Sequence, residues 1–253
     1  RWRLSYSALC RALKISRLMS ELVFVRHGQA SFGTASYDAL SKRGFEQVRE
    51  LAKHWLETGE SFQAIYTGTL QRQRETATEL AAVVEGQVAP QRMKSLNEYH
   101  GDPLIHIYLR DHAEREGVTP PGAWPIKDNK IFQSVLEAAS ACWIRDELEP
   151  QESDKGFEYW RDFKRRVFEA VDQIMAAHTG GRRVLVSTSG GVIATALQRV
   201  LGFSDQQTIA TNWMVHNSSV TRVRYGGDRV SLSQFNSLPH LERQGKQHLI
   251  TFR

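Results

Sequence analysis

One short stretch near the beginning of the sequence constrains the fold more than any other part. The residues from Leu22 to Val25 are all apolar, and most of them are β-branched or aromatic, which is typical of a buried strand. The run stops at Arg26-His27-Gly28, where a cation, an imidazole and a permissive backbone follow one another. In an open α/β sheet the carboxyl ends of the strands face the ligand crevice. We therefore expect His27 at the ligand-binding edge of a sheet, although a histidine after a strand is often only a loop residue.

The rest of the chain alternates between strand-like and helix-like patterns, which favours a mostly parallel sheet with helices on both faces. With 253 residues and a hydrophobic fraction of 41%, the chain can bury a full core. We predict an α/β fold closed by a terminal hairpin, with residues 21–253 as a single domain and an inserted cap-like region at about 101–153. The predicted helices are 42–58, a helix beginning within 68–77, 131–148, 157–175 and 192–201; the predicted strands are 22–25, 62–67, 184–187, 220–225 and 230–235.

The first twenty residues differ in composition from the remainder. They carry five Lys or Arg residues and no Asp or Glu, a composition that is typical of a presequence. We interpret residues 1–20 as a non-native upstream segment or a presequence-like segment and exclude them from the fold. Removing residues 1–18 is expected to leave the activity and the melting temperature nearly unchanged.

Charge and cysteine content exclude several classes of function. The net charge of +5 suits anionic ligands, but the basic residues are spread out and not interleaved with aromatics, so we expect no nucleic-acid partner. Cys10 and Cys142 are far apart and lack metal-ligand spacing, so we expect neither a disulfide framework nor a zinc site. No apolar run approaches the roughly 20 residues of a membrane helix. We expect a cytoplasmic protein that needs no metal or cofactor. The sequence does not define its oligomeric state.

Two charged side chains are candidates for phosphate chemistry. Arg72 lies in the first turn of a predicted helix, where a cation is unfavourable with the helix dipole unless an anion is close by. The plainer interpretation is that Arg72 is solvated or paired with Glu75 or Glu79. Glu98 could likewise be an ordinary surface carboxylate. Beside a histidine at a strand end, however, Glu98 would supply the proton donor that phosphate-ester cleavage needs.

A glycine-rich turn is the third candidate element. The turn Ser189-Gly190-Gly191 joins a predicted strand to a predicted helix. Glycines at such a turn let backbone N–H groups and the positive end of the helix point at an anion. Alternatively, Ser189 is a simple N-cap of the helix. The two interpretations are compatible.

Taken in order, these segments resemble the motifs of the histidine phosphatase superfamily, also called phosphoglycerate mutase-like. The resemblance covers about residues 21–241. A single Arg-His-Gly is a common tripeptide, but the ordered set is specific. It consists of Leu22-Val-Phe-Val-Arg-His-Gly-Gln, Thr67-Gly-Thr-Leu-Gln-Arg-Gln-Arg-Glu-Thr-Ala, Leu96-Asn-Glu, Arg166-Val167, Ser189-Gly-Gly-Val-Ile, Asn217-Ser-Ser-Val-Thr and the segment from Asn236 to His240-Leu241.

The resemblance implies a metal-independent phosphomonoesterase that acts on a small phosphorylated substrate through a phosphohistidine. His27 would be the nucleophile, and its neutral form would be favoured by neighbouring arginines. Arg26 and Arg72 would grip the phosphoryl oxygens through their planar guanidinium groups. Glu98 would protonate the leaving alkoxide and then activate water. The backbone at Ser189 and Gly190 would complete the phosphate pocket, and an acidic to neutral optimum is expected.

One departure from the family pattern concerns the last motif. The family usually has Ser-His-Gly-Gly, whereas this chain has Thr188-Ser189-Gly190-Gly191. A serine hydroxyl can donate one hydrogen bond but carries no positive charge, and loss of one such donor commonly costs about 3 kcal/mol of transition-state stabilisation. His100 or His216 is a less favoured source of the missing imidazole, because neither residue has the spacing of a family motif. Ser189→His is expected to retain or raise turnover. Two alternatives stay open: a phosphoglycerate-type mutase, and an inactive phospho-ligand binding protein.

Overall fold

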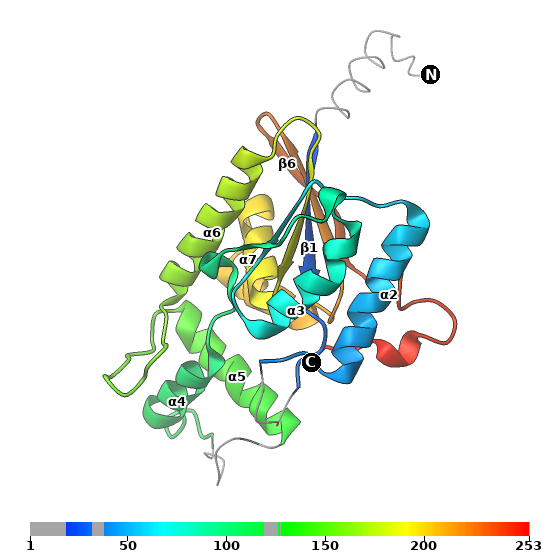
Figure 1. Cartoon of the computed structure of the whole chain (residues 1–253). Helices are drawn as coiled ribbons and strands as arrows, with labels where there is room; N and C mark the ends of the chain where they lie inside the picture. The colour runs from blue at the N-terminus through cyan, green and yellow to red at the C-terminus, as the bar shows by residue number, and fades with distance from the viewer. Residues whose placement is uncertain (1–18, 32–37, 119–125, 127, 253) are drawn as a thin grey trace, which may run out of the picture.

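The computed structural model describes residues 19–31, 38–118, 126 and 128–252 (Figure 1). The proline-rich break predicted at Pro120, Pro121 and Pro125 lies outside these residues. Of the amino-terminal segment 1–20, residues 1–18 also lie outside them, whereas Ser20 is buried and begins the first strand, so it is part of the fold.

A six-stranded sheet forms the centre of the molecule, with the strand order β3-β2-β4-β1-β5-β6. Strands β1 to β4 pair in parallel, whereas β5 runs antiparallel to β1 and forms a hairpin with β6. The mostly parallel sheet and the terminal hairpin confirm the predicted fold class. The strands are β1 (Ser20–Arg26), β2 (Ala64–Thr67), β3 (Gln91–Arg92), β4 (Arg183–Thr188), β5 (Val220–Gly226) and β6 (Arg229–Ser237).

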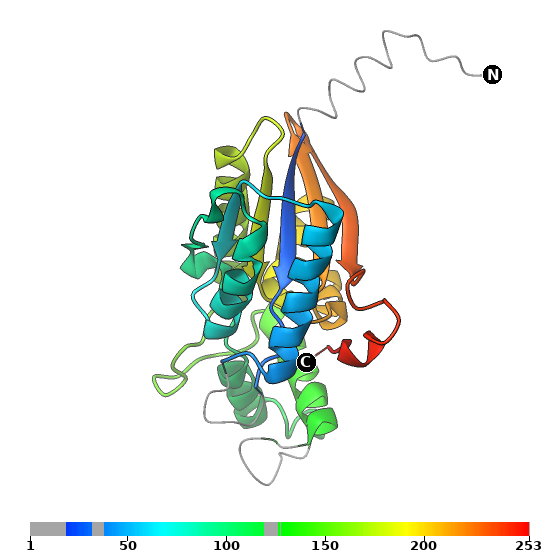
Figure 2. The same cartoon turned by 45° about the vertical axis from the view of Figure 1, so that its right-hand side comes forward.

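Helices cover both faces of the sheet (Figures 1 and 2). One face packs against α2 and α3, and the other against α6 and α7, while α4 and α5 lie at the end of the sheet toward which β1 points. The helices of the described chain are α2 (Lys42–Thr58), α3 (Gln71–Leu80), α4 (Gly101–Asp111), α5 (Asn129–Ile144), α6 (Trp160–Ala177), α7 (Gly190–Leu201) and α8 (Asp205–Met214), with short 3₁₀ turns at Ala81–Val83, Glu85–Gln87, Lys94–Leu96 and Gln247–Leu249.

Strand β1 contributes to both hydrophobic cores. Because successive side chains of a strand point to opposite faces, Leu22 and Phe24 pack with α6 and α7, whereas Val23 and Val25 pack with α2 and α3. All four side chains are at most 1% exposed. The strand is therefore fixed from both sides up to the residue before Arg26.

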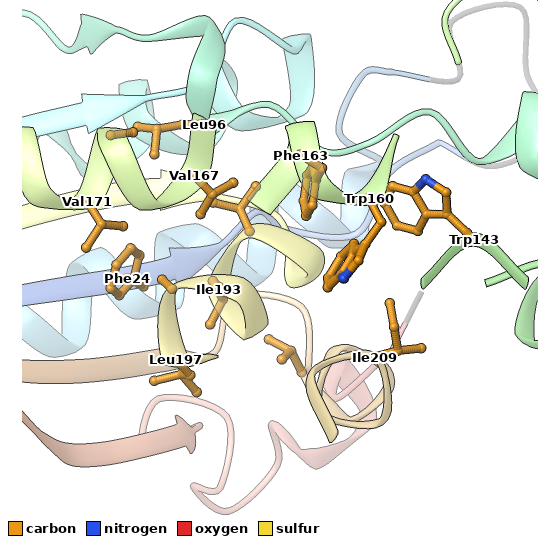
Figure 3. Packing of buried hydrophobic residues seen from close by; sticks show 14 of the residues in the cluster. Phe24, Leu96, Trp143, Trp160, Phe163, Val167, Val171, Ile193, Leu197 and Ile209 are labelled. Atoms are coloured by element: carbon orange, nitrogen blue, oxygen red, sulfur yellow. The ribbon is translucent and has the colours of Figure 1, made fainter. Parts of the chain in front are cut away.

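An aromatic cluster joins α5 to α6, which covers one face of the sheet (Figure 3). Trp143 of α5 lies edge-on to Trp160 of α6, with ring centroids 4.9 Å apart, and Phe163 lies 5.7 Å from both rings. The indole N–H of Trp143 donates to the Glu158 carbonyl. Tyr99 also packs on this cluster, 4.8 Å from Trp143, so the chain next to Glu98 is anchored to it.

The elements differ from the prediction mainly between β3 and β4 and at α8. Helices α4 and α8 were not predicted. Helix α5 ends at Ile144 instead of continuing to residue 148, and α6 begins at Trp160 because Tyr159 has extended backbone dihedrals. Helix α2 matches the prediction at both ends: Ser41 caps its first turn through the Gly44 N–H, and Gly59 adopts a left-handed conformation after Thr58.

Candidate active site

The histidine at the end of β1 is held by its backbone. The His27 N–H donates to the Thr188 carbonyl of β4 at 2.8 Å. Its own carbonyl accepts from the Asn217 side-chain amide at 3.2 Å and from the Ser218 N–H at 3.3 Å. The residue is only 6% exposed. These contacts fix His27 at the carboxyl edge of the sheet, as the sequence predicted.

The imidazole is fixed in one neutral tautomer. His27 Nδ1 lies 2.7 Å from the Gly28 carbonyl oxygen, which can only accept, so Nδ1 carries the proton. Nε2 then holds a lone pair, and Arg72 Nε donates to it at 3.1 Å. The pKa of His27 is well below its usual value, first because of burial and then because of Arg72 and Arg26. The sequence attributed this shift to the arginines alone, whereas burial is the larger cause.

Arg72 is oriented by a carboxylate that the sequence did not single out. Arg72 forms an ion pair with Asp38, and Asp38 also accepts from the Gln71 N–H at the start of α3, at 2.6 Å. The cation in the first helical turn is thus balanced by Asp38. The plainer interpretation, pairing with Glu75 or Glu79, is wrong: Glu79 pairs with Arg49, and Glu75 accepts from the Leu40 N–H.

Arg26 reaches the same site from β1. Its guanidinium group donates to the Val215 carbonyl. A Cβ atom built on Gly190 would lie 3.8 Å from Arg26 Nε, so the start of α7 runs directly beside this side chain. Arg26 and Arg72 both lower the pKa of His27. The structure therefore brings Arg26, Arg72, His27 and Gly190 together.

Glu98 has the environment of a proton donor. Its Oε2 accepts from the Gly191 N–H at 2.9 Å. Burial raises the pKa of Glu98 above its usual value, while the Gly191 N–H, Arg72 and Arg26 oppose the shift. The carboxyl group consequently keeps its proton to higher pH than an ordinary glutamate does. Because the same two arginines act on Glu98 and His27, the predicted acid and the predicted nucleophile belong to one site.

The loop before Glu98 is held by an arginine on α6. Arg166 donates to the carbonyls of Ser95 and Asn97 at 2.9 and 2.8 Å, and its other nitrogens form a bidentate pair with Glu158. The sequence placed Arg166 in a family motif without a role. Its contacts show that it fixes the backbone on the approach to Glu98.

Glycines permit two close approaches of backbone at this site. A Cβ atom on Gly191 would lie 2.3 Å from Glu98 Oε1, so only glycine leaves room for that carboxylate. A Cβ atom on Gly28 would lie 2.4 Å from the Gly44 carbonyl oxygen, and one on Gly44 would lie 2.2 Å from the Gln29 carbonyl oxygen. The first turn of α2 therefore packs backbone against backbone on the loop that follows His27.

Ser189 occupies the N-cap position of α7 but does not act as a side-chain cap. The interpretation of Ser189 as a simple N-cap is therefore wrong. Its Oγ instead accepts from Gln73 Nε2 at 2.9 Å, and both residues are buried, at 1% and 0% exposure. Gln73 was missed in the sequence, although it lies four residues before Ala77 and hence on the apolar face of α3. A polar residue on that face was the available signal.

The two histidines considered as substitutes for the missing imidazole have other partners. His100 is largely exposed and lies 3.7 Å from Asp102. His216 Nδ1 lies 2.9 Å from the Asn236 amide, and its ring packs on Phe252. In the described chain, neither imidazole hydrogen-bonds to Ser189.

One group outside the site has the side-chain types of metal ligands. His112, Cys142 and Glu147 offer donor atoms within 4.8 Å of one another. Arg115 lies 2.7 Å from His112 Nδ1, Arg145 lies 3.6 Å from Cys142 Sγ, and burial raises the pKa of the Cys142 thiol to about 11. These donor atoms are engaged in contacts within the chain, and the expectation of a metal-independent protein stays a prediction.

The fold and the site define a class: α/β proteins that present a neutral histidine between two guanidinium groups at the carboxyl edge of a mostly parallel sheet. The chain belongs to the histidine phosphatase superfamily (branch 1), whose family model matches residues 22–117 and 121–238. In the part of the chain that the structure describes, no helix has the length and apolar character needed to cross a membrane.

Relatives within the superfamily include both mutases and phosphatases. The chain is 26% identical over 214 residues to a 2,3-bisphosphoglycerate-dependent phosphoglycerate mutase of Histophilus somni (strain 2336), covering 75% of this chain and 88% of that protein. It is 25% identical over 241 residues to a metal-independent phosphoserine phosphatase of Arabidopsis thaliana, covering 92% and 88%. The crystal structure of phosphoglycerate mutase from Bacillus anthracis str. Sterne has the same fold, with a TM-score of 0.62, 20% identity and coverage of 89% and 97%.

Proposed function

We propose that the protein is a metal-independent phosphomonoester hydrolase that acts through a phosphohistidine on His27. The observation that carries this proposal is the tautomer of His27. Its Nδ1 proton is engaged by the Gly28 carbonyl, which leaves the Nε2 lone pair beside Arg72. A neutral, oriented imidazole next to two cations is suited to attack a phosphate ester.

In the first half of the reaction, Arg72 turns its Nε–H from His27 Nε2 to a phosphoryl oxygen. The freed Nε2 lone pair attacks phosphorus, and the bond between phosphorus and the ester oxygen breaks. Arg72 and Arg26 neutralise the charge on the phosphoryl oxygens. The protonated Glu98 gives its proton to the leaving alkoxide, which departs as an alcohol. The raised pKa of Glu98 supports this role, because the group must be protonated when the substrate binds.

In the second half, Glu98 takes a proton from a water molecule, and the resulting hydroxide attacks the phosphohistidine. The bond between phosphorus and Nε2 breaks, inorganic phosphate leaves and the lone pair of His27 is restored. Glu98 ends protonated, as it began. Each turnover therefore consumes one ester and one water and regenerates both side chains without a cofactor.

The substrate is expected to be a small phosphorylated metabolite. Support comes from the superfamily neighbours, which include a phosphoserine phosphatase of Entamoeba histolytica solved with phosphoserine and with 3-phosphoglyceric acid. Several relatives favour the second candidate function: phosphoglycerate mutases of Histophilus somni, Glaesserella parasuis and Haemophilus influenzae match most of this chain. A mutase would pass the same phosphoryl group to a second hydroxyl of the substrate instead of to water. The third candidate, an inactive phospho-ligand binding protein, rests on Ser189.

The test is turnover of p-nitrophenyl phosphate, phosphoserine and phosphoglycerates in the presence of a metal chelator. Release of phosphate together with an acid-labile phosphoenzyme, both abolished in His27→Ala, is the expected result. Isomer formation without phosphate release would favour the mutase. Binding of phosphorylated ligands with neither turnover nor phosphoenzyme would favour the inactive binding protein, and wild-type turnover in His27→Ala would refute the assignment of the nucleophile.

A further inference from the structure

The phosphate pocket of this chain differs from the family pattern at the position of the second histidine, and the structure shows what stands there. The side chain of Gln73 is fully buried beneath the turn between β4 and α7. Its Nε2 donates to the Leu96 carbonyl at 3.1 Å and to Ser189 Oγ at 2.9 Å. Since a carbonyl oxygen can only accept, the contact with Leu96 determines which end of the amide faces Ser189.

This arrangement leaves one polar atom without a partner. Gln73 Oε1 is buried and has no hydrogen-bond partner among the described residues. It lies against the bare backbone of Gly68, where a Cβ atom would be 1.8 Å away. A buried acceptor without a partner lowers stability, and an apolar side chain of similar length would avoid that loss. The presence of an amide at this position therefore points to a role for its other end, the Nε2 donor.

We propose that Gln73 is a positioning residue that aims the hydroxyl proton of Ser189 at the substrate phosphate, so that Gln73 and Ser189 together take the place of the second histidine. A serine hydroxyl has one proton and two lone pairs. Because Nε2 occupies a lone pair, the proton must point elsewhere, and among the described residues it has no acceptor. Ser189 lies between Thr188, whose carbonyl binds His27, and Gly190, which runs beside Arg26.

The inference rests on the proposed function for its kinetic part, and a double-mutant cycle tests it. The proteins are the wild type, Gln73→Met, Ser189→Ala and the double variant. The readouts are kcat and KM with p-nitrophenyl phosphate and the Kd of inorganic phosphate by calorimetry. Methionine keeps the length of Gln73 but removes the donor. We expect kcat to fall about 100-fold in Ser189→Ala, the size of effect seen when one transition-state donor is removed, and clearly, though less, in Gln73→Met.

The decisive comparison is between the effect of Gln73→Met in the wild type and its effect in Ser189→Ala. If Gln73 acts through Ser189, Gln73→Met causes no further loss once Ser189 is alanine. If Gln73 only supports the fold, the two losses multiply, and that result overturns the proposal. Should Gln73→Met fail to fold, Gln73→Leu serves in the same cycle. If the wild type shows no turnover, the proposed function fails, but the cycle on phosphate binding still decides the role of Gln73.

A second experiment tests whether the side chains at positions 73 and 189 compete for the same volume. A histidine ring at position 189 extends beyond the present Oγ, which is already 2.9 Å from Gln73 Nε2. We therefore expect Ser189→His alone to lose turnover and thermal stability, and Gln73→Ala combined with Ser189→His to recover both. For the single variant this reverses the expectation from sequence, which did not include Gln73. A gain of turnover in Ser189→His without loss of stability would contradict the shared position of the two side chains.

Discussion

His27 and Glu98 experience the same surroundings with opposite consequences for their charge. Burial disfavours the ionised form of both groups, so it lowers the pKa of the imidazole and raises that of the carboxyl. The two shifts therefore move the pH ranges in which each residue is neutral toward each other and favour the state in which both are neutral. This is the protonation state in which His27 can attack and Glu98 can donate.

The pH profile of kcat/KM tests this reasoning. The rate should fall at low pH as His27 is protonated and at high pH as Glu98 loses its proton. In Arg72→Gln the acid limb should move to higher pH, because Arg72 is the second-largest cause of the lowered pKa of His27. Arg74→Gln, two residues along the same helix, is the control and should leave both limbs in place. An acid limb that stays unchanged in Arg72→Gln would contradict the assignment of that limb to His27.

Glu98 should reduce stability at the pH where it is ionised. Since its pKa is raised in the folded state, the folded protein binds a proton that the unfolded chain releases, and stability falls as the pH rises through the folded pKa. Glu98→Gln should therefore melt at a higher temperature than the wild type at pH 8 and at a similar temperature at pH 4. Calorimetric scans at both values check this. Equal melting temperatures at pH 8 would show that the carboxyl group is well solvated.

Among the individual residues of the site, the sequence located the side chains that follow strand ends or lie at glycine turns. Arg26, His27 and Gly190 can be found in this way because strand ends and turns leave a local pattern. Asp38 and Gln73 cannot be found so directly. Each acts through a partner distant in the chain, and a polar side chain in a loop or on a short helix is ordinarily solvated.

At the level of elements, the start of α7 is shaped around the carboxyl group of Glu98. Gly191→Ala places a methyl group 2.3 Å from Glu98 Oε1. Because the helix backbone is rigid, the Glu98 carboxylate has to move. We expect kcat to fall at least tenfold while the far-ultraviolet spectrum is unchanged. Gly101→Ala is the matched control, because its Cβ would meet its nearest atom, in Leu136, at an ordinary 3.7 Å. Full activity in Gly191→Ala would mean that Glu98 does not need its present position.

Helix α6 presents two adjacent arginines with different surroundings. Arg166 is partly buried and bridges Glu158 to two carbonyls, whereas Arg165 is mostly exposed and, among the residues that the structure describes, pairs with Asp162 alone. Arg166→Gln should lower the free energy of unfolding by about 2 kcal/mol, since it removes hydrogen bonds from a charged donor to carbonyls that stay partly buried. Arg165→Gln should change it by less than about 0.5 kcal/mol. Urea denaturation of both variants provides the comparison, and equal losses would place Arg166 among ordinary surface arginines.

The two helices that were not predicted, α4 and α8, differ in the local signal that their sequences carry. Gly101, Asp102 and Pro103 have the composition of a turn, yet they begin α4, because proline is tolerated in the first turn of a helix, where the N–H is unpaired. Helix α8 carried a usable signal. Ser204 and Gln207 form a capping box at its start.

For the whole molecule, the shared strand β1 links the stability of the two cores. Phe163 lies at 0% exposure in the aromatic cluster on one face. Phe163→Ala should lower the free energy of unfolding by about 3–5 kcal/mol, and unfolding should stay a single transition that also releases α2 on the other face. Leu56→Ala, at a site 59% exposed, should have little effect. Separate transitions followed by the fluorescence of Trp55 and by hydrogen exchange in α6 would show that the cores are independent.

The alternation of strands and helices was sufficient to predict the α/β class, but not the strand order. Strand β1 pairs with β4 and β5, which are formed by residues 183–188 and 220–226. Such pairings depend on long-range packing and leave no trace in a local pattern of apolar residues. The sequence also does not show that Leu22 and Phe24 face one core while Val23 and Val25 face the other. A strand buried on both faces has a continuous apolar sequence.

The backbone contact between the loop after His27 and the start of α2 has a consequence for natural variation. Because neither Gly28 nor Gly44 has room for a single methyl group, the two positions cannot diverge one at a time while the helix stays where it is. Among homologous chains, glycine should therefore be gained or lost at both positions together, and a side chain at either one should mark a lineage in which α2 has shifted relative to the histidine.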